Sequence, residues 1–407
     1  MRVDHITITD MNYTNTPGAA SSALAARHHA SGLNSRFNGW QPSFADYVAL
    51  QREMIALARP DADAAIIDGN APFELTPAGK YPAGKEKPYK RGVLLTHGLT
   101  DSPYFMRHLA EFFQQNGFRV MAVLLPGHGT QPGDLLDAHW QEWAKAVAYG
   151  ADRLSAEVDE IYLAGYSAGG ALSVYQSLRD ERVRGLFLFS PAFAISPKAA
   201  WARLHKFYSW LIPRAKWVSI MPDLDTYKYE SFPKNAAAQM YALTREVKAQ
   251  LLLHKLDLPV FAAASADDTT VDSTATLNFM MHMPHPSSKL VLYTTDAGKR
   301  TRGFPDEKLE LVNSVLPRQK ILSSAHTAIV LRPDDAHYGA AGNYSNCTHY
   351  YPGERAKYDA CINRPNEVPQ GEITEQNLEA WTMRRLMYNP HFAALEISMK
   401  RFIETLP

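Results

Sequence analysis

Long apolar segments are missing from this sequence. No run of about 18 apolar residues occurs, and that is the shortest length at which a helix spans a bilayer. The N-terminus also lacks the apolar core of about seven or more residues that a secretory signal peptide needs. We therefore expect a cytoplasmic protein with no stable membrane insertion, although a leader removed before residue 1 would leave the same sequence.

Cysteine is scarce, with only Cys347 and Cys361 in 407 residues. This scarcity excludes a disulfide-dense scaffold, and neither cysteine belongs to a close C-x-x-C pair of the kind that binds zinc. A local disulfide and two buried free thiols both fit the pattern. For a cytoplasmic chain we favour free thiols. We expect no metal and no cofactor.

Neither sign of charge is in excess, because the chain has 42 Lys and Arg against 42 Asp and Glu. There is thus no electrostatic basis for a nucleic acid or an anionic membrane surface as a partner. Hydrophobic residues make up 46% and charged residues 21%, which excludes a disordered or collagen-like chain and allows a large buried core. The oligomeric state stays open.

Between residues 91 and 192, short apolar runs alternate with amphipathic segments. Near-continuous apolar strands that alternate with helices predict a mostly parallel sheet covered by helices on both faces, which is an α/β fold. The predicted strands are 93–96, 119–125, 160–164 and 183–189, and the predicted helices are 103–115, 140–154 and 170–178.

The remaining segments suggest one core domain with an inserted cap. An aromatic-rich block interrupts the alternation, which then returns with predicted strands at 259–264 and 289–293, a helix at 277–283 and a further strand at 321–323. We divide the chain into an N-terminal arm, helix (44–58) and linker (1–90), a first core part (91–195), a helical cap (196–256), and a second core part (257–407) with an insertion (296–319) and C-terminal helices (374–403).

Residues 165–169 read Gly-Tyr-Ser-Ala-Gly, a G-x-S-x-G pattern that follows a predicted strand and opens a predicted helix. Glycines on both sides of the serine permit a tight turn that projects its hydroxyl from the carboxyl end of the sheet. The N-terminus of the following helix favours negative charge beside it. We therefore predict that Ser167 is a nucleophile.

A longer stretch carries a family resemblance. The run VLLTHGLTDSPYFMRHLAEFFQQNGFRVMAVLLPGHGT (93–130), followed by GYSAGG, resembles α/β-hydrolases of the monoacylglycerol lipase, carboxylesterase and serine aminopeptidase group. The resemblance is clear over 91–192 and recurs weakly at 257–330. It implies an α/β-hydrolase fold with a serine nucleophile. In such folds a backbone N–H after the His-Gly that ends an early strand joins the N–H after the nucleophile in an oxyanion hole, which assigns Leu99 and Ala168. We expect the side chains of His97 and His128 to brace loops.

The catalytic acid of this fold follows the nucleophile in sequence, and the histidine comes last. The predicted strand at 259–264 leads into Ser265-Ala266-Asp267-Asp268, where the group typically shows Gly-x-x-Asp. This register assigns Asp268, with Ser265 in place of the usual glycine. Asp267, one residue out of register, is the alternative.

The histidine is harder to assign, because Thr-Thr-Asp and no histidine follows the predicted strand at 289–293. A loop of small residues ends at His326, so we assign His326 as the base and treat 296–319 as an insertion. His337 and His349 are the alternatives.

The predicted activity is hydrolysis of small carboxylic esters with an apolar acyl group, through a Ser-Asp-His triad and an acyl-enzyme. Epoxide hydrolase and haloalkane dehalogenase chemistry is disfavoured because the nucleophile is Ser rather than Asp. A serine peptidase or aminopeptidase, an acyltransferase and a non-catalytic binding protein of the same fold are the alternatives. Three acids of the cap keep a peptidase open: Asp223, Asp225 and Glu230.

Overall fold

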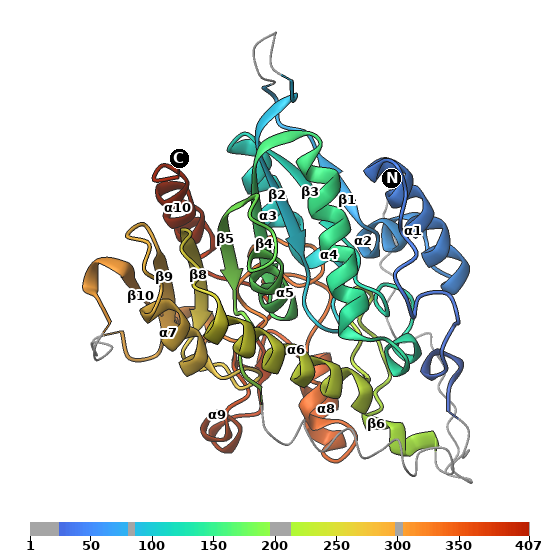
Figure 1. The fold of residues 1–407 in the computed structure, drawn as a ribbon. Helices are drawn as coiled ribbons and strands as arrows, with labels where there is room; N and C mark the ends of the chain where they lie inside the picture. Colours follow the sequence, from blue (N-terminus) through green and yellow to red (C-terminus); the bar gives the residue numbers. More distant parts are fainter. Residues whose placement is uncertain (1–23, 80–85, 196–212, 298–303, 407) are drawn as a thin grey trace, which may run out of the picture.

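The computed structural model describes residues 24–79, 86–195, 213–297 and 304–406, and it contains a central eight-stranded sheet (Figure 1). The strand order is β1-β3-β2-β4-β5-β8-β9-β10, and every pairing is parallel except β1 with β3. The predicted α/β class is confirmed. The strands are β1 Phe73–Leu75, β2 Tyr89–Thr96, β3 Phe118–Val123, β4 Val158–Tyr166, β5 Val183–Phe189, β8 Val260–Ser265, β9 Lys289–Thr294 and β10 Leu309–Asn313.

Helices cover the sheet on both faces because successive side chains of its strands point to opposite sides. Leu94 of β2 belongs to one buried apolar cluster, whereas its neighbours Val93 and Leu95 belong to the other. The first cluster includes residues of α1 (Phe44–Ala58), α4 (Trp140–Ser155), α5 (Ala168–Ser177), α6 (Lys234–Leu253) and α7 (Ser273–Met281). The second includes residues of α3 (Arg107–Gln115) and α10 (Phe392–Ile403).

Most helices begin and end close to the predicted residues. The helix α1 has the predicted bounds, and Ser43 caps it by accepting a hydrogen bond from the N–H of Asp46. The predicted helix at 103–115 is divided into a 3₁₀ turn, Pro103–Met106, and α3. Among the described helices, which also include α2 (Ala64–Asn70), α8 (Arg355–Asn363) and α9 (Glu375–Ala380), none is long and apolar enough to cross a membrane.

The predicted strand at 321–323 is wrong. Ile321 makes only isolated bridges, to Leu316 and Gln370. The last strand of the sheet is β10, which lies within the predicted insertion and pairs in parallel with β9. Its residues are half-buried or exposed, as expected at a sheet edge, so the strand lacks the continuous apolar run by which the central strands were identified.

Part of the predicted cap and part of the N-terminal arm, residues 196–212 and 1–23, lie outside the described residues. Within the rest of the predicted cap, the strands β6 (Trp217–Ser219) and β7 (Phe232–Pro233) form a short antiparallel pair. The long helix α6 follows and crosses below the central strands in Figure 1. The division into arm, core and cap stays a prediction.

A disulfide joins Cys347 to Cys361, so the expectation of free thiols is wrong. Both cysteines are buried in a small apolar cluster with Tyr350 and Tyr358. Disulfides are typical of proteins that fold in oxidising surroundings.

Candidate active site

Ser167 occupies a sharp turn between β4 and α5. Its backbone has φ +54° and ψ −114°, a conformation that a residue with a side chain rarely adopts. The glycines around it are required by close approach of the backbone. A Cβ on Gly165 would lie 2.1 Å from the carbonyl oxygen of Gly169, and one on Gly169 would lie 2.0 Å from that of Thr96. The G-x-S-x-G pattern therefore reflects the space available in this turn.

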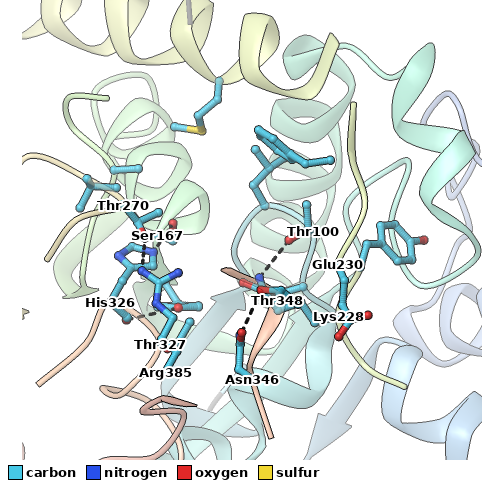
Figure 2. A pocket seen from close by; sticks show the side chains of 18 of the residues that line it. Thr100, Ser167, Lys228, Glu230, Thr270, His326, Thr327, Asn346, Thr348 and Arg385 are labelled. Atoms are coloured by element: carbon cyan, nitrogen blue, oxygen red, sulfur yellow. Dashed lines mark hydrogen bonds and ion pairs between the residues drawn. The ribbon is translucent and has the colours of Figure 1, made fainter. Parts of the chain in front are cut away.

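The structure brings His326 and Asp268 to this serine in a hydrogen-bonded series. The Nε2 atom of His326 lies 3.0 Å from Oγ of Ser167, and its Nδ1 atom lies 2.6 Å from Oδ2 of Asp268. An ionised carboxylate accepts a proton from Nδ1, which leaves Nε2 as the acceptor facing the hydroxyl. Figure 2 shows the contact between Ser167 and His326.

The two candidate acids have different surroundings. Burial alone would raise the pKa of Asp268, but the nearby His326 and the N–H groups of Val271 and Thr270 lower it below the usual value. Asp267 instead accepts a hydrogen bond from the hydroxyl of Thr295, and burial raises its pKa. Of these two acids, only Asp268 hydrogen-bonds to the histidine.

The alternative histidines lie elsewhere. The ring of His337 contacts Asp225 and Asn343, and the ring of His349 contacts the carbonyl oxygen of Met383. Neither contacts Ser167, whereas His326 reaches it from the segment that follows β10.

The loop after β2 carries the predicted oxyanion-hole residue Leu99, which lines the same cavity as Ser167. Ala168 is the first residue of α5, so its N–H has no acceptor within the helix. The next residue of the β2 loop, Thr100, has φ +68°. Two residues of the predicted cap hydrogen-bond to it. Its carbonyl oxygen accepts the N–H of Tyr229 at 2.8 Å, and its hydroxyl accepts from Nζ of Lys228 at 2.9 Å.

Two buried histidines brace this region from below. His97 accepts the N–H of Leu125 at Nε2, so its Nδ1 donates to the carbonyl oxygen of Gly98. The Nδ1 of His128 lies within hydrogen-bond distance of the carbonyl oxygens of Leu125 and Pro126. Burial lowers the pKa of His97 well below its usual value, with a further contribution from His128, and burial lowers the pKa of His128 to about 4.

Because burial lowers the pKa values of these two histidines, we expect the free energy of unfolding to fall in mild acid. Between pH 6.5 and pH 4 the unfolded chain binds a proton at His128 that the folded chain does not bind, so the free energy of unfolding falls as the pH falls. From pH 6.5 to pH 5 this one residue should cost about 2 kcal/mol. Denaturant unfolding across this range measures the slope. His128→Gln should reduce the slope, and His254→Gln, at an exposed position, should leave it unchanged. Equal slopes in all three proteins would contradict the prediction.

Above Ser167 lies a cavity of about 380 Å³ with two kinds of wall. In Figure 2, Ser167 and His326 lie on one side, and Lys228, Glu230, Asn346 and Thr348 lie on the other. The apolar lining consists of Leu99, Ala192, Ile195, Phe232, Ala237, Met240 and Val271. The polar lining includes Thr100, Lys228, Glu230, Tyr344, Asn346, Thr348 and Arg385.

Several of these polar residues were not foreseen from the sequence. Tyr344, Asn346, Thr348 and Arg385 belong to the C-terminal part of the chain, where no motif marks them. They lie near Ser167 only because segments far apart in the sequence pack together in the folded chain.

The acids Asp223, Asp225 and Glu230 are the reason that a peptidase activity stays an alternative. Of these three, only Glu230 lines the cavity. Its carboxylate accepts hydrogen bonds from the hydroxyl of Tyr344 and the N–H of Leu224. Asp223 and Asp225 instead bind His28 and Tyr338 respectively. Within the described ranges, no group of three or more His, Cys, Asp or Glu side chains is arranged to hold a metal ion.

Comparison with known proteins identifies the family to which the chain belongs. The family model described as "Serine aminopeptidase, S33" matches residues 87–295, just over half of the chain. A thermostable monoacylglycerol lipase of Bacillus sp. (strain H-257) is 29% identical over 184 residues, which cover 44% of this chain and 71% of the lipase. A carboxylesterase of Bacillus subtilis (strain 168) is 32% identical over 85 residues, 21% of this chain and 35% of the esterase, so the chain spans about a third of that relative.

Solved structures of lipolytic enzymes are also similar. A structure reported with the metagenome-derived lipolytic enzymes LipS and LipT is 23% identical with a TM-score of 0.45, over 55% of this chain and 87% of that one. A monoacylglycerol lipase of Paleococcus ferrophilus is 18% identical with a TM-score of 0.40, over 51% of this chain and 86% of that one. On the family match and the sheet described above, the chain belongs to the serine aminopeptidase S33 family of α/β-hydrolase serine hydrolases.

Proposed function

We propose that this protein hydrolyses small carboxylic esters through a triad of Ser167, His326 and Asp268. The observation that carries the proposal is the hydrogen-bonded series from Ser167 Oγ to His326 Nε2 (3.0 Å) and from His326 Nδ1 to Asp268 Oδ2 (2.6 Å). A nucleophile, a base and a group that orients the base are the three parts that acyl transfer needs. A binding protein of this fold would have no need for such a series.

The first half of the reaction forms an acyl-enzyme. His326 takes the proton of Ser167 as Oγ attacks the ester carbonyl carbon. Asp268 stabilises the imidazolium that results, and its lowered pKa keeps it ionised near neutral pH. The backbone N–H groups of Leu99 and Ala168 stabilise the oxyanion, after which the C–O bond breaks and His326 gives its proton to the leaving alcohol.

The second half releases the acid. Water enters, His326 removes its proton, and the resulting hydroxide attacks the acyl carbon through a second oxyanion. The tetrahedral intermediate collapses, and Ser167 leaves with the proton from His326. The enzyme returns to its starting state with no cofactor.

The lining of the cavity supports an ester with an apolar acyl group. The apolar residues from the segment after β5 and from α6, among them Ile195, Ala237 and Met240, offer a surface on which an acyl chain is removed from water. The names of the Bacillus relatives, a monoacylglycerol lipase and a carboxylesterase, agree with this substrate class.

An aminopeptidase activity is the second candidate, and Glu230 is the observation that favours it. A free α-amino group needs a carboxylate near the scissile bond, and Glu230 lines the cavity. Both of its oxygens already accept hydrogen bonds, from Tyr344 and Leu224, which reduces their capacity to bind an ammonium group. We therefore rank ester hydrolysis first.

A substrate series tests the choice. We expect p-nitrophenyl esters from acetate to palmitate to be hydrolysed with an optimum at one chain length, because the cavity of about 380 Å³ limits the acyl group. Aminoacyl p-nitroanilides should be cleaved far more slowly. Faster cleavage of the anilides would favour the aminopeptidase, and inertness toward both series would contradict the proposal.

A further inference from the structure

Glu372 is a fully buried acid outside the region that the family model matches. It follows the short strand β11 (Gln370–Gly371), and its side chain is 0% exposed. Burial of a carboxylate is costly unless it is paired and hydrogen-bonded. The contacts that balance this cost therefore indicate what the residue does.

One oxygen of Glu372 binds the loop of the histidine. Its Oε2 atom accepts the backbone N–H of His326 at 2.8 Å. The hydroxyl of Ser323 accepts the backbone N–H of Glu372 at 2.9 Å, so the two segments are joined at two points. The backbone of His326 is thereby held independently of its ring.

The other oxygen of Glu372 binds the loop of the acid. Its Oε1 atom accepts the hydroxyl of Thr269 at 3.1 Å, next to Asp268 in the chain. It also accepts the N–H of Ile373 at 2.8 Å. One carboxylate therefore joins the two loops that carry the histidine and the acid.

Arg385 completes the connection. Its Nη2 atom lies 2.7 Å from Oε1 of Glu372 and donates to the hydroxyl of Thr270 at 2.6 Å. The backbone N–H of Thr270 in turn donates to Oδ1 of Asp268. Arg385 belongs to the short strand β12 (Arg384–Arg385), which pairs with β11. The pairing of these strands brings Arg385 close enough to Glu372 to form the ion pair.

We propose that Glu372, with Arg385, is a positioning residue that holds the His326 loop and the Asp268 loop at the separation required for catalysis. The inference rests on the proposed function. Glu372 does not touch the reacting atoms. It acts through the backbone of His326 and the neighbours of Asp268, and a displacement of about 1 Å at a reacting group can cost about 100-fold in rate.

Glu372 and Arg385 carry opposite charges beside the loops of the proposed base and acid, so removal of one charge or the other should have opposite electrostatic effects on the reaction. Loss of the Glu372 charge should therefore move the acid-side midpoint of the kcat/KM profile to lower pH, and loss of the Arg385 charge should move it to higher pH. Charged and titratable groups from the surrounding elements lie around this histidine and its partner Asp268: Asp101 with its partner Lys228, Tyr166, Glu372 and Arg385.

Kinetics of two charge-removing variants test the proposal. Glu372→Gln should lower kcat by about 10- to 100-fold and leave KM within about twofold, because Glu372 itself does not line the cavity. Its acid-side midpoint should fall by about 0.5 pH unit, and that of Arg385→Gln should rise by a similar amount. Glu367→Gln, an exposed acid three residues before β11, is the matched control and should behave as the wild type.

A purely structural ion pair would lower the yield of folded enzyme without opposite shifts in the pH profile. Midpoints that move in the same direction or not at all, or a Glu372→Gln variant with wild-type kcat, would overturn the proposal. If Glu372→Gln does not fold, Arg385→Gln alone tests the rise in the midpoint.

A measurement without substrate separates this proposal from the proposed function. The proton between His326 Nδ1 and Asp268 Oδ2 should give a low-field ¹H NMR signal, assigned by its loss in Asp268→Asn. Glu372→Gln should shift or broaden this signal. An unchanged signal would overturn the positioning role, whereas ester hydrolysis that is absent from the wild type would count against the function alone.

Discussion

Replacement of Ser167 by Ala should reduce ester hydrolysis by about 10⁵- to 10⁶-fold in kcat, to the level that binding and the oxyanion hole alone provide. Ser167 is the only hydroxyl placed 3.0 Å from Nε2 of His326 within the described residues. Without it no acyl-enzyme forms, and the base has no nucleophile to activate. The fold should be unaffected, because Ala lacks only the Oγ atom.

The measurement is kcat for the best p-nitrophenyl ester, supported by mass spectrometry after treatment with an organophosphonate. The wild type should gain one adduct at Ser167 and the variant none. Ser177→Ala is the matched control, since this serine lies in the adjoining helix α5 and its hydroxyl donates only to a backbone carbonyl, that of Val174. Retention of more than about 1% of activity by Ser167→Ala would rule out the proposed mechanism, because loss of a triad nucleophile costs far more than that.

Asp268→Asn should lower kcat by about 10⁴-fold, the second largest effect that we predict. An amide at this position donates to Nδ1 of His326 instead of accepting from it, which reverses the tautomer and leaves Nε2 unable to take the proton of Ser167. Asn has nearly the same size as Asp and can still reach Nδ1 of His326, which lies 2.6 Å from Asp268 in the wild type. The loss of activity therefore reports on the position of the proton.

The neighbouring acid provides a control that differs by one residue in the chain. Asp267→Asn should keep kcat within about twofold of the wild type, since Asp267 hydrogen-bonds to Thr295 and the histidine hydrogen-bonds to Asp268 instead. Steady-state kinetics of the two variants decides between the two acids that the sequence left open. A large loss in Asp267→Asn with little change in Asp268→Asn would reverse the assignment.

The parts of the fold that the sequence predicted well are those whose signals are local. The strand at 160–164 and the helix at 170–178 are defined by residues within one window of about ten, and both were found as β4 and α5. The serine turn between them was found because glycine is the only residue that fits at Gly165 and Gly169, whatever lies farther away.

The parts that the sequence missed depend on contacts between distant segments. The edge strand β10 has half-exposed residues and is stabilised by its pairing with β9, so its own pattern is weak. Glu372 and Arg385 resemble surface residues in their local sequence. Glu372 is buried and Arg385 is half-buried because β11 and β12 pair and bring them against the loops of His326 and Asp268, and His326 is 46 residues from Glu372 in the chain.

We expect the bond between Cys347 and Cys361 to make substrate recognition dependent on how the protein is produced. Cys347 lies between Asn346 and Thr348, which both face the cavity, so the bond anchors one wall of the pocket but none of the three residues that would perform the chemistry. A host with a reducing cytosol and one with an oxidising periplasm would then yield preparations with equal titres of reactive serine. We expect the two preparations to differ in the range of esters that they accept.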